Sequence, residues 1–410
     1  MLQQVSKEPG STRAEPTADS AATPAPPAPA TPRPILTAPR GSNISVLLDL
    51  VRGLAAIGVM LSHGRNLFFE DYGGLESPSP LLKLAYFLTG FGHEMVMIFF
   101  VLSGYFIGSS VVRDLSRNRW SWTRYAVNRL TRLYIVLIPA VLLTLVLDQA
   151  ALHWLNSEIH QGNGGQICIP DVRPRDGAEV LLGNLAFLQE IAVPTFGSNT
   201  PLWSLGSEFW YYLLFPALLI TLTPGARQRT LHLVFFLVAG WIALRWMPLF
   251  GVWLLGAALA FLPRSEWLSR PGLRRPLLAI SILLTAGALT ISRFHLANPL
   301  LADYLVGLTF TAVVLCVLHV PGECRFQTGR QLAEGLAQMS YSLYAIHLPL
   351  LAFLAAMLLS GRRWQPGITT IAAFLVIQLA AFAAAALFAR LTEVRTDRVR
   401  RHVERLTGLA

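Results

Sequence analysis

The strongest constraint on the fold is a series of about ten apolar stretches that recur along the chain. A helix needs roughly 20 apolar residues to cross the hydrocarbon core of a bilayer, and only helices and closed barrels satisfy their backbone hydrogen bonds there. The composition agrees, because 53% of the residues are hydrophobic and only 14% are charged, against about 25% in a soluble domain. The sequence therefore predicts an all-α polytopic membrane protein. The expected spans lie near residues 44–64, 85–112, 133–153, 202–222, 231–248, 249–263, 276–293, 299–320, 339–359 and 368–390.

These spans form one predicted membrane domain, residues 44–392. The sixth span, 249–263, is short for a full crossing and is expected to be strongly tilted or re-entrant. Its boundary with the fifth span is placed near Met247 and Pro248. We expect no attached soluble catalytic domain, so any chemistry must take place within the membrane domain or at its rim.

Two polar tails are predicted on either side of this domain. Residues 1–43 contain nine prolines and few large apolar side chains, a composition that predicts a disordered or polyproline-like cytoplasmic segment. Residues 393–410 form a basic tail. The first apolar stretch begins only near residue 44, so it is expected to act as an uncleaved insertion signal rather than a cleaved signal peptide.

The distribution of basic residues predicts the orientation in the membrane. With the N-terminus inside, 24 of the 33 Lys and Arg residues fall in inner segments and eight in outer ones. This asymmetry favours both termini in the cytoplasm and an even number of crossings. It also accounts for the net charge of +10, so we expect no nucleic-acid partner. The arginine- and tryptophan-containing stretch 113–132 is typical of an interfacial segment.

The sequence gives no sign of a metal or a tightly bound cofactor. Its three cysteines, Cys168, Cys316 and Cys324, fall in an outer loop, a helix and an inner segment of the expected topology, so we expect no disulfide among them. There is no HExxH pattern and no tight His/Asp cluster. A GxSxG elbow and a Walker A motif are also absent.

The first span carries a line of polar side chains formed by Asp49, Arg52 and His63. A charge at the centre of a membrane helix costs roughly 2.5–3.5 kcal/mol on insertion scales, and such residues are usually functional. Eleven residues are close to three helical turns, so Arg52 and His63 are expected on one face, roughly 16 Å apart. Asp49 is at neighbour spacing to Arg52. The alternative is that Asp49 pairs with Arg52 merely to permit insertion.

A second polar group lies in PLWSLGSEFWYYLLFP, residues 201–216. Glu208 is inside this apolar span, with Ser204 four residues before it and Tyr211 three after, so the three side chains can share a helix face. Glu208 can orient a histidine or accept a hydrogen bond from a substrate hydroxyl. The alternative is a glutamate that hydrogen-bonds to its neighbours in helix packing.

Two further stretches add candidate histidines. His93 stands near the outer end of the second span, where the following Ser103 and Gly104 are interpreted as small residues that allow close helix packing. In MSYSLYAIHLPLL, residues 339–351, Tyr344 and His347 are three residues apart, and Ser340 precedes Tyr344 by one turn. Pro349 is expected to bend this helix and release a backbone carbonyl. His93 and His347 serve either a substrate site or packing.

Together these stretches resemble the acyltransferase-3 family of integral membrane acyltransferases. The family's first helix has a basic residue, ten intervening residues and a histidine, here Arg52 and His63 in LDLVRGLAAIGVMLSH. The stretch FFVLSGYFI resembles the family's FFVLSGF-type segment. LWSLGSEFWYYLLFP resembles a segment that often reads WSLxxEExxY, with Glu208 at the first acidic position and Phe209 at the second. NLAFLQ and SYSLYAIHLPL complete the series, in the expected order over about residues 44–390.

The resemblance implies ten membrane helices in a bacterial inner membrane and transfer of an acyl group, commonly acetyl, from cytoplasmic acyl-CoA. The implied acceptor is a hydroxyl of a cell-surface or exported glycan or glycolipid. His63 is then expected as general base or nucleophile, Arg52 as a ligand of the donor and Glu208 as an orienting group, with the other named residues near the substrates. The competing class is a transporter or flippase for an anionic lipid or sugar. The sequence does not specify the oligomeric state.

Overall fold

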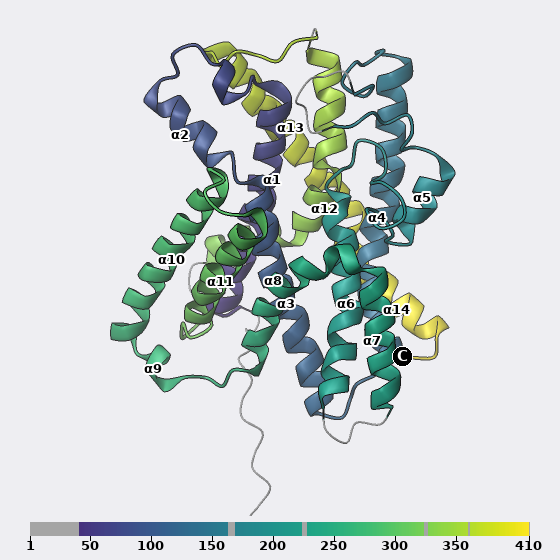
Figure 1. Ribbon diagram of the computed structural model, residues 1–410, viewed down its shortest axis with the longest axis vertical. Helices are drawn as coiled ribbons and strands as arrows, with labels where there is room; N and C mark the ends of the chain where they lie inside the picture. Colours follow the sequence, from purple (N-terminus) through teal and green to yellow (C-terminus); the bar gives the residue numbers. More distant parts are fainter. Residues whose placement is uncertain (1–40, 163–168, 224–227, 324–326, 360, 410) are drawn as a thin grey trace, which may run out of the picture. The chain divides into compact units, whose positions relative to one another are not determined.

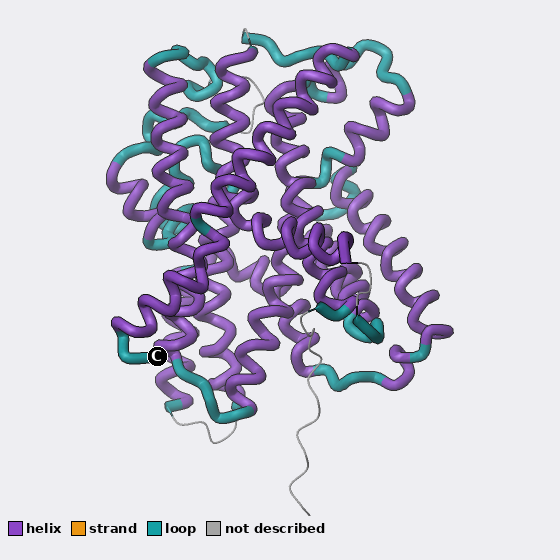
Figure 2. Tube along the Cα trace, turned by 180° about the vertical axis from the view of Figure 1, so that it is seen from behind, coloured by secondary structure: helices purple, strands orange, loops and turns teal. Residues whose placement is uncertain are grey.

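The computed structural model describes residues 41–162, 169–223, 228–323, 327–359 and 361–409, all within one compact unit. Within these ranges the regular structure is helical, and no strand is formed (Figures 1 and 2). The predicted N-terminal tail therefore lies outside the described residues except for its last three positions. Among those, Ser42 caps the first helix by accepting a hydrogen bond from the Ser45 N–H.

Nine helical segments among the described residues are long and apolar enough to cross a membrane, which confirms a multi-pass, all-α membrane protein. A tenth apolar helix, α7 (Arg229–Ile242), is shorter. The nine segments are α1 (Asn43–Phe68), α2 (Pro80–Leu88) with α3 (Gly92–Ser116), α4 (Trp122–His153), α6 (Leu202–Leu222), α8 (Met247–Ala258) with its flanking 3₁₀ turns η2 (Leu244–Trp246) and η3 (Leu259–Phe261), α10 (Pro271–Arg293), α11 (Pro299–Val317), α12 (Gln327–Leu358), and α13 (Ile368–Leu391) with η4 (Glu393–Arg395) and α14 (Thr396–Leu406). The remaining short elements are η1 (Tyr72–Gly74), α5 (Ala178–Leu185) and α9 (Glu266–Ser269).

The predicted boundary between the fifth and sixth spans is wrong. The break falls at Ala243, and the segment from Leu244 to Phe261 is long enough to cross, whereas α7 is the short helix. Pro248 misled the prediction because it occupies the first turn of α8. A proline is tolerated there, since the N–H groups of the first turn have no partner within the helix.

The second predicted span is also divided. Residues 89–91 separate α2 from α3, so His93 and Glu94 lie in the first turn of α3 rather than inside a continuous helix. Gly90 lies in this break, which is consistent with the low helix propensity of glycine. The stretch 113–132 completes α3 and begins α4, with residues 117–121 outside a helix.

Helix α1 packs against α12 and α3, and α3 packs closely against α8. The close approach depends on small residues, as predicted for Gly104. A Cβ atom at Gly104 would collide with the backbone carbonyl of Trp253, and one at Gly256 would collide with that of Val101. Glycine is needed at both positions because the two backbones meet there.

Pro349 frees a backbone carbonyl in α12, as predicted. A proline at this position has no N–H to donate to Ala345, four residues earlier. The Ala345 carbonyl instead accepts a hydrogen bond of 2.8 Å from the side-chain amide of Asn199. This bond ties the chain that leads into α6 to the part of α12 that carries Tyr344 and His347.

Pro216 has the same effect in α6. Its missing N–H leaves the Tyr212 carbonyl free, and the Tyr125 hydroxyl of α4 donates to that carbonyl at 3.0 Å. The sequence alone did not point to this contact. It links α4 to α6 next to the candidate site.

The C-terminal segment that was predicted as a basic tail forms η4 and α14. Helix α14 packs against α4 (Figure 1). The first residue of the segment, Glu393, reaches back to α12. One carboxylate oxygen accepts hydrogen bonds from the Ser342 N–H at 3.0 Å and from the Ser342 hydroxyl at 2.9 Å. The segment is therefore attached to the same helix that carries His347.

Candidate active site

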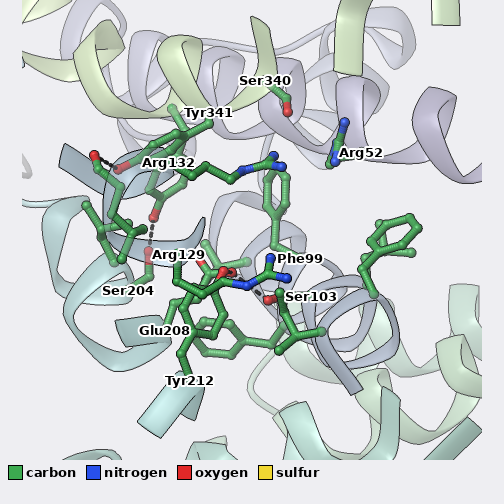
Figure 3. A pocket seen from close by; sticks show the side chains of 18 residues that line it. Arg52, Phe99, Ser103, Arg129, Arg132, Ser204, Glu208, Tyr212, Ser340 and Tyr341 are labelled. Atoms are coloured by element: carbon green, nitrogen blue, oxygen red, sulfur yellow. Dashed lines mark hydrogen bonds between the residues drawn. The ribbon is translucent and has the colours of Figure 1, made fainter. Parts of the chain in front are cut away.

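A cavity of about 460 Å³ lies between α1, α3, α4, α6 and α12, and we call it the arginine cavity. Figure 3 shows its labelled side chains converging from these helices. Its wall combines guanidinium groups, hydroxyls and a carboxylate with aromatic rings. The polar members are Arg52, Ser103, Arg129, Arg132, Ser204, Glu208 and Ser340, and the aromatic ones include Phe99, Phe106, Tyr212, Tyr341 and Tyr344.

Arg52 is held on the cavity wall by two partners. Its guanidinium lies 3.4 Å from the Asp49 carboxylate and donates to the Ala337 carbonyl of α12 at 3.0 Å. The predicted Asp49–Arg52 pair is thus formed, although Asp49 itself does not line the cavity. Arg52 and His63 both contact α12, as expected for residues about three turns apart.

Arg129 and Arg132, one turn apart on α4, add two cations to the cavity. Within the described part of the chain, neither guanidinium forms an ion pair with a carboxylate. Arg129 lies over the rings of Tyr125 and Tyr212, 5.4 and 6.0 Å from their centroids. Because these cations face a cavity without a paired anion, the site is suited to an anionic ligand.

Glu208 is the carboxylate of the cavity. Its Oε1 accepts hydrogen bonds from the Ser103 hydroxyl at 2.5 Å and from the Tyr212 hydroxyl at 2.6 Å. Ser103 also accepts from the indole N–H of Trp253 at 3.2 Å. Ser103 was interpreted as a packing residue, but its hydroxyl is part of this network in the cavity.

The expectation that Tyr211 shares a face with Glu208 is wrong. Tyr211 is fully buried, and its hydroxyl donates to the Trp246 carbonyl at 2.8 Å, outside the cavity. Tyr212 takes the expected place. On a helix of 3.6 residues per turn, the fourth residue is rotated by about 40° and the third by about 60° in the opposite sense. The i+4 position was therefore the better match.

Ser204 and Tyr344 meet across the cavity. Their hydroxyl oxygens are 2.6 Å apart, and the Tyr344 hydroxyl also donates to the Pro201 carbonyl at 3.1 Å. The structure thus brings together a residue from α6 and one from α12 that were predicted separately. The ring of Tyr344 lies 5.9 Å from that of His347, so the cavity wall continues into the histidine pair described next.

His63 and His347 form a hydrogen-bonded pair. His63 Nδ1 lies 2.7 Å from His347 Nε2, and the rings are stacked with centroids 5.0 Å apart. His347 is buried, whereas His63 is partly exposed. The expectation that Glu208 orients His63 is wrong, because Glu208 bonds to Ser103 and Tyr212, and the residue beside His63 is His347.

The backbone fixes the proton positions of this pair. His347 Nδ1 faces the Tyr344 carbonyl at 2.8 Å, and a carbonyl can only accept, so Nδ1 carries the hydrogen. In a neutral imidazole the other nitrogen is then an acceptor. His347 Nε2 accepts from His63 Nδ1, which leaves the lone pair on His63 Nε2 free. The arrangement presents His63 Nε2 as a base or nucleophile.

His93 is placed elsewhere. Its Nε2 lies 2.8 Å from the Asp303 carboxylate, and its ring stacks on Trp203 at 6.2 Å. Within the described ranges no hydrogen bond or ring contact joins it to either member of the histidine pair, and its side chain is half exposed.

Tyr212 and Tyr341 were missed by sequence reasoning, and Arg129 and Arg132 were noted only as part of the arginine-containing stretch 113–132. One signal was present for the two arginines. Ser121 is a favourable N-cap, and its side chain accepts from the Arg124 N–H, which marks the start of α4. Reading a helix from residue 122 would have placed Arg129 and Arg132 at i, i+3 on one face.

The described residues contain no group of three or more His, Cys, Asp or Glu side chains arranged to hold a metal ion. Cys316 is buried and free. The other two cysteines, Cys168 and Cys324, lie outside the described residues.

Comparison with known proteins identifies the family. The model of the acyltransferase domain of type 3 matches residues 46–390, nearly the whole membrane domain. The chain belongs to the acyltransferase-3 family. It is therefore an enzyme that transfers acyl groups other than aminoacyl groups, and the comparison gives no support to a transporter. Searches of curated proteins and of solved structures find no match.

Proposed function

We propose that this acyltransferase moves an acyl group, with acetyl as the expected group, from cytoplasmic acyl-CoA to a hydroxyl of a cell-surface or exported carbohydrate or glycolipid. The observation that carries the proposal is the arginine cavity, where Arg129 and Arg132 lack carboxylate partners among the described residues. Guanidinium groups bind phosphates through paired, charge-assisted hydrogen bonds. A donor molecule that is rich in phosphate therefore fits this cavity best.

The donor enters from the cytoplasm in this proposal. The distribution of basic residues favours both termini inside a bacterial inner membrane. Arg129 and Arg132 then lie near the cytoplasmic end of α4, and Arg52 lies about 14 Å along α1 from its start. His63 is about 16 Å further along α1. A donor with its phosphates at the arginines extends its thioester along α1 toward His63.

His63 acts on the acceptor. Its Nε2 removes the proton from an acceptor hydroxyl, and the oxygen attacks the thioester carbonyl carbon of the donor. The C–O bond of the new ester forms as the C–S bond breaks. The CoA thiolate leaves and takes the proton from the His63 imidazolium. A nucleophilic route, in which His63 Nε2 first carries the acyl group, uses the same nitrogen.

His347, Glu208 and Tyr344 support these steps. His347 holds the His63 tautomer that has its lone pair on Nε2. Glu208 fixes the hydroxyls of Ser103 and Tyr212 in the cavity and balances part of its positive charge. Tyr344 connects the cavity wall to the histidine pair.

The test uses purified protein in lipid nanodiscs with acetyl-CoA and bacterial surface glycans. We expect CoA release coupled to O-acetylation of the glycan, detected by mass spectrometry. His63→Ala should abolish both, whereas the exposed His402→Ala on α14 should change neither. Normal glycan acylation by the His63 variant would refute the role of His63, and transport without CoA release would refute the proposed function.

A further inference from the structure

A second cavity, of about 540 Å³, lies apart from the arginine cavity, and we call it the loop cavity. It is formed by the segment between α4 and α6, the first turn of α6 and the turn between α7 and α8. The residues that matter below are Arg175, Glu190, Thr195, Trp203, Arg245 and Trp246. None of them belongs to the machinery described above.

Trp246 provides the first indication of a ligand. The residue is only 6% exposed, lines the loop cavity, and its indole N–H has no hydrogen-bond partner within the described ranges. Buried N–H groups are nearly always paired, and an unpaired one needs an explanation. A ligand in the cavity that accepts a hydrogen bond would supply the missing partner.

The indole is held in place without this hydrogen bond. Trp246 stacks on Trp203 with centroids 5.5 Å apart, and the Arg245 guanidinium lies 5.9 Å from its ring centroid. The Trp246 carbonyl accepts from the Tyr211 hydroxyl, which anchors the backbone. The free donor is therefore preorganised rather than loosely placed.

Glu190 adds an acceptor on the same wall. Its φ of +61° is in the left-handed region, which non-glycine residues seldom adopt and which is enriched at functional sites. Its carboxylate is 3.4 Å from the Arg245 guanidinium. Arg175 donates to the Thr195 hydroxyl at 3.3 Å. The cavity thus offers donors and acceptors close together.

We propose that the loop cavity binds the carbohydrate acceptor, an inference that rests on the proposed function. A sugar carries many hydroxyls, each a donor and an acceptor, and so matches a wall with an indole N–H, guanidinium groups, a carboxylate and hydroxyls. An apolar ligand would leave these polar groups without partners.

Trp203 connects this site to the arginine cavity. It lines the loop cavity, while the next residue, Ser204, lines the arginine cavity. Its ring meets Phe100, another residue of the arginine cavity, edge to face at 6.1 Å. Trp203 thus lines the loop cavity and also contacts a residue of the arginine cavity.

Trp246→Phe tests the proposal because it removes the indole N–H, together with one ring of the indole, and keeps an aromatic ring in the stack. Glu190→Gln is a second variant, which removes the charge and keeps the shape. Trp267→Phe is the matched control, since Trp267 is 69% exposed on α9 and contacts Arg270 outside both cavities. Unfolding temperatures in nanodiscs verify that each variant is folded.

Binding is measured without turnover, on an array of bacterial surface oligosaccharides, with His63→Ala as the background. We expect at least one oligosaccharide to bind, and Trp246→Phe and Glu190→Gln each to weaken it about tenfold, a loss typical of one well-placed hydrogen bond. Trp267→Phe should bind like the parent. Absence of binding to any oligosaccharide, or binding unchanged by both cavity variants, would overturn the proposal.

A second readout separates this inference from the proposed function. In the active protein, the two cavity variants should raise the KM for the glycan about tenfold and leave the KM for acetyl-CoA unchanged. Acylation with an unchanged glycan KM would overturn the loop-cavity proposal while the proposed function stands. Trp246-dependent oligosaccharide binding without any CoA release would refute the proposed function and support the sugar site.

Discussion

His63 donates a hydrogen bond from Nδ1 to Nε2 of His347 at 2.7 Å, and His347 in turn donates from Nδ1 to the Tyr344 carbonyl. The chain of donors ends on a backbone atom that cannot reverse its role. It leaves one lone pair, on His63 Nε2, available to a substrate. The Tyr344 carbonyl thus determines, through His347, which nitrogen of His63 keeps a free lone pair.

This relay predicts that activity depends on a hydrogen-bond acceptor at position 347 more than on the aromatic ring. His347→Phe keeps the size but removes the acceptor, so we expect kcat to fall roughly 10–100-fold, as when other groups that orient a histidine are removed. His347→Gln supplies a carbonyl oxygen that accepts from His63 and should retain most of the activity. Steady-state kinetics would decide, and equal losses in both variants would indicate a packing role only.

The unpaired arginines predict a donor-side defect. Arg132→Gln should raise the KM for acetyl-CoA by about 10–100-fold, because it removes a charge-assisted hydrogen bond to phosphate. Arg132→Lys should recover part of the loss, and the exposed Arg398→Gln should have no effect. The defect should shrink as the ionic strength rises, since salt screens the contribution of Arg132 in the parent. An unchanged KM in Arg132→Gln would remove this residue from the donor site.

The hydrogen bonds of Glu208 predict that stability depends on the oxygen atom at this position and not on its charge. Glu208→Ala leaves the Ser103 and Tyr212 hydroxyls without their acceptor, at a cost of about 1–3 kcal/mol for each buried group. Glu208→Gln keeps an oxygen at that position and should unfold close to the temperature of the parent. Thermal unfolding in detergent would compare the two, and similar unfolding temperatures would contradict the network.

Glu393 predicts that residues beyond the family match contribute to stability. Glu393→Ala removes the acceptor for both the N–H and the hydroxyl of Ser342, so we expect a loss of about 1–3 kcal/mol and a lower unfolding temperature. Glu404→Ala on α14 is the control, because the Glu404 carboxylate makes, among the described residues, only a long ion pair of 3.7 Å with Arg400. Equal unfolding temperatures for the two variants would show that the Ser342 contact contributes little.

The fold and the local contacts were accessible from sequence because they depend on short-range periodicity. The Asp49–Arg52 pair follows from i, i+3 spacing, and the carbonyl freed by Pro349 follows from its missing N–H. The error at Tyr211 concerned only which side of a correctly predicted helix the residue occupies. Such features need only the helix geometry and not the positions of other helices.

The partners of the histidines could not be predicted from the sequence in this way. His63 and His347 are separated by 284 residues, and spacing within one helix cannot show which helices pack together. The same holds for the convergence of Arg52 with Arg129 and Arg132, which come from different helices. The predicted position of the break between α7 and α8 was wrong for another reason, because a proline can begin a helix as well as end one.

The hydrogen bond from Tyr125 to the carbonyl freed by Pro216 acts as a latch between two helices. A slide of α4 past α6 by one turn would break it and leave a polar carbonyl unsatisfied within the membrane. The latch therefore holds Arg129 and Glu208 in a constant register. A movement in the catalytic cycle that slides α4 past α6 has to break this hydrogen bond, whereas a movement of the other helices leaves it intact.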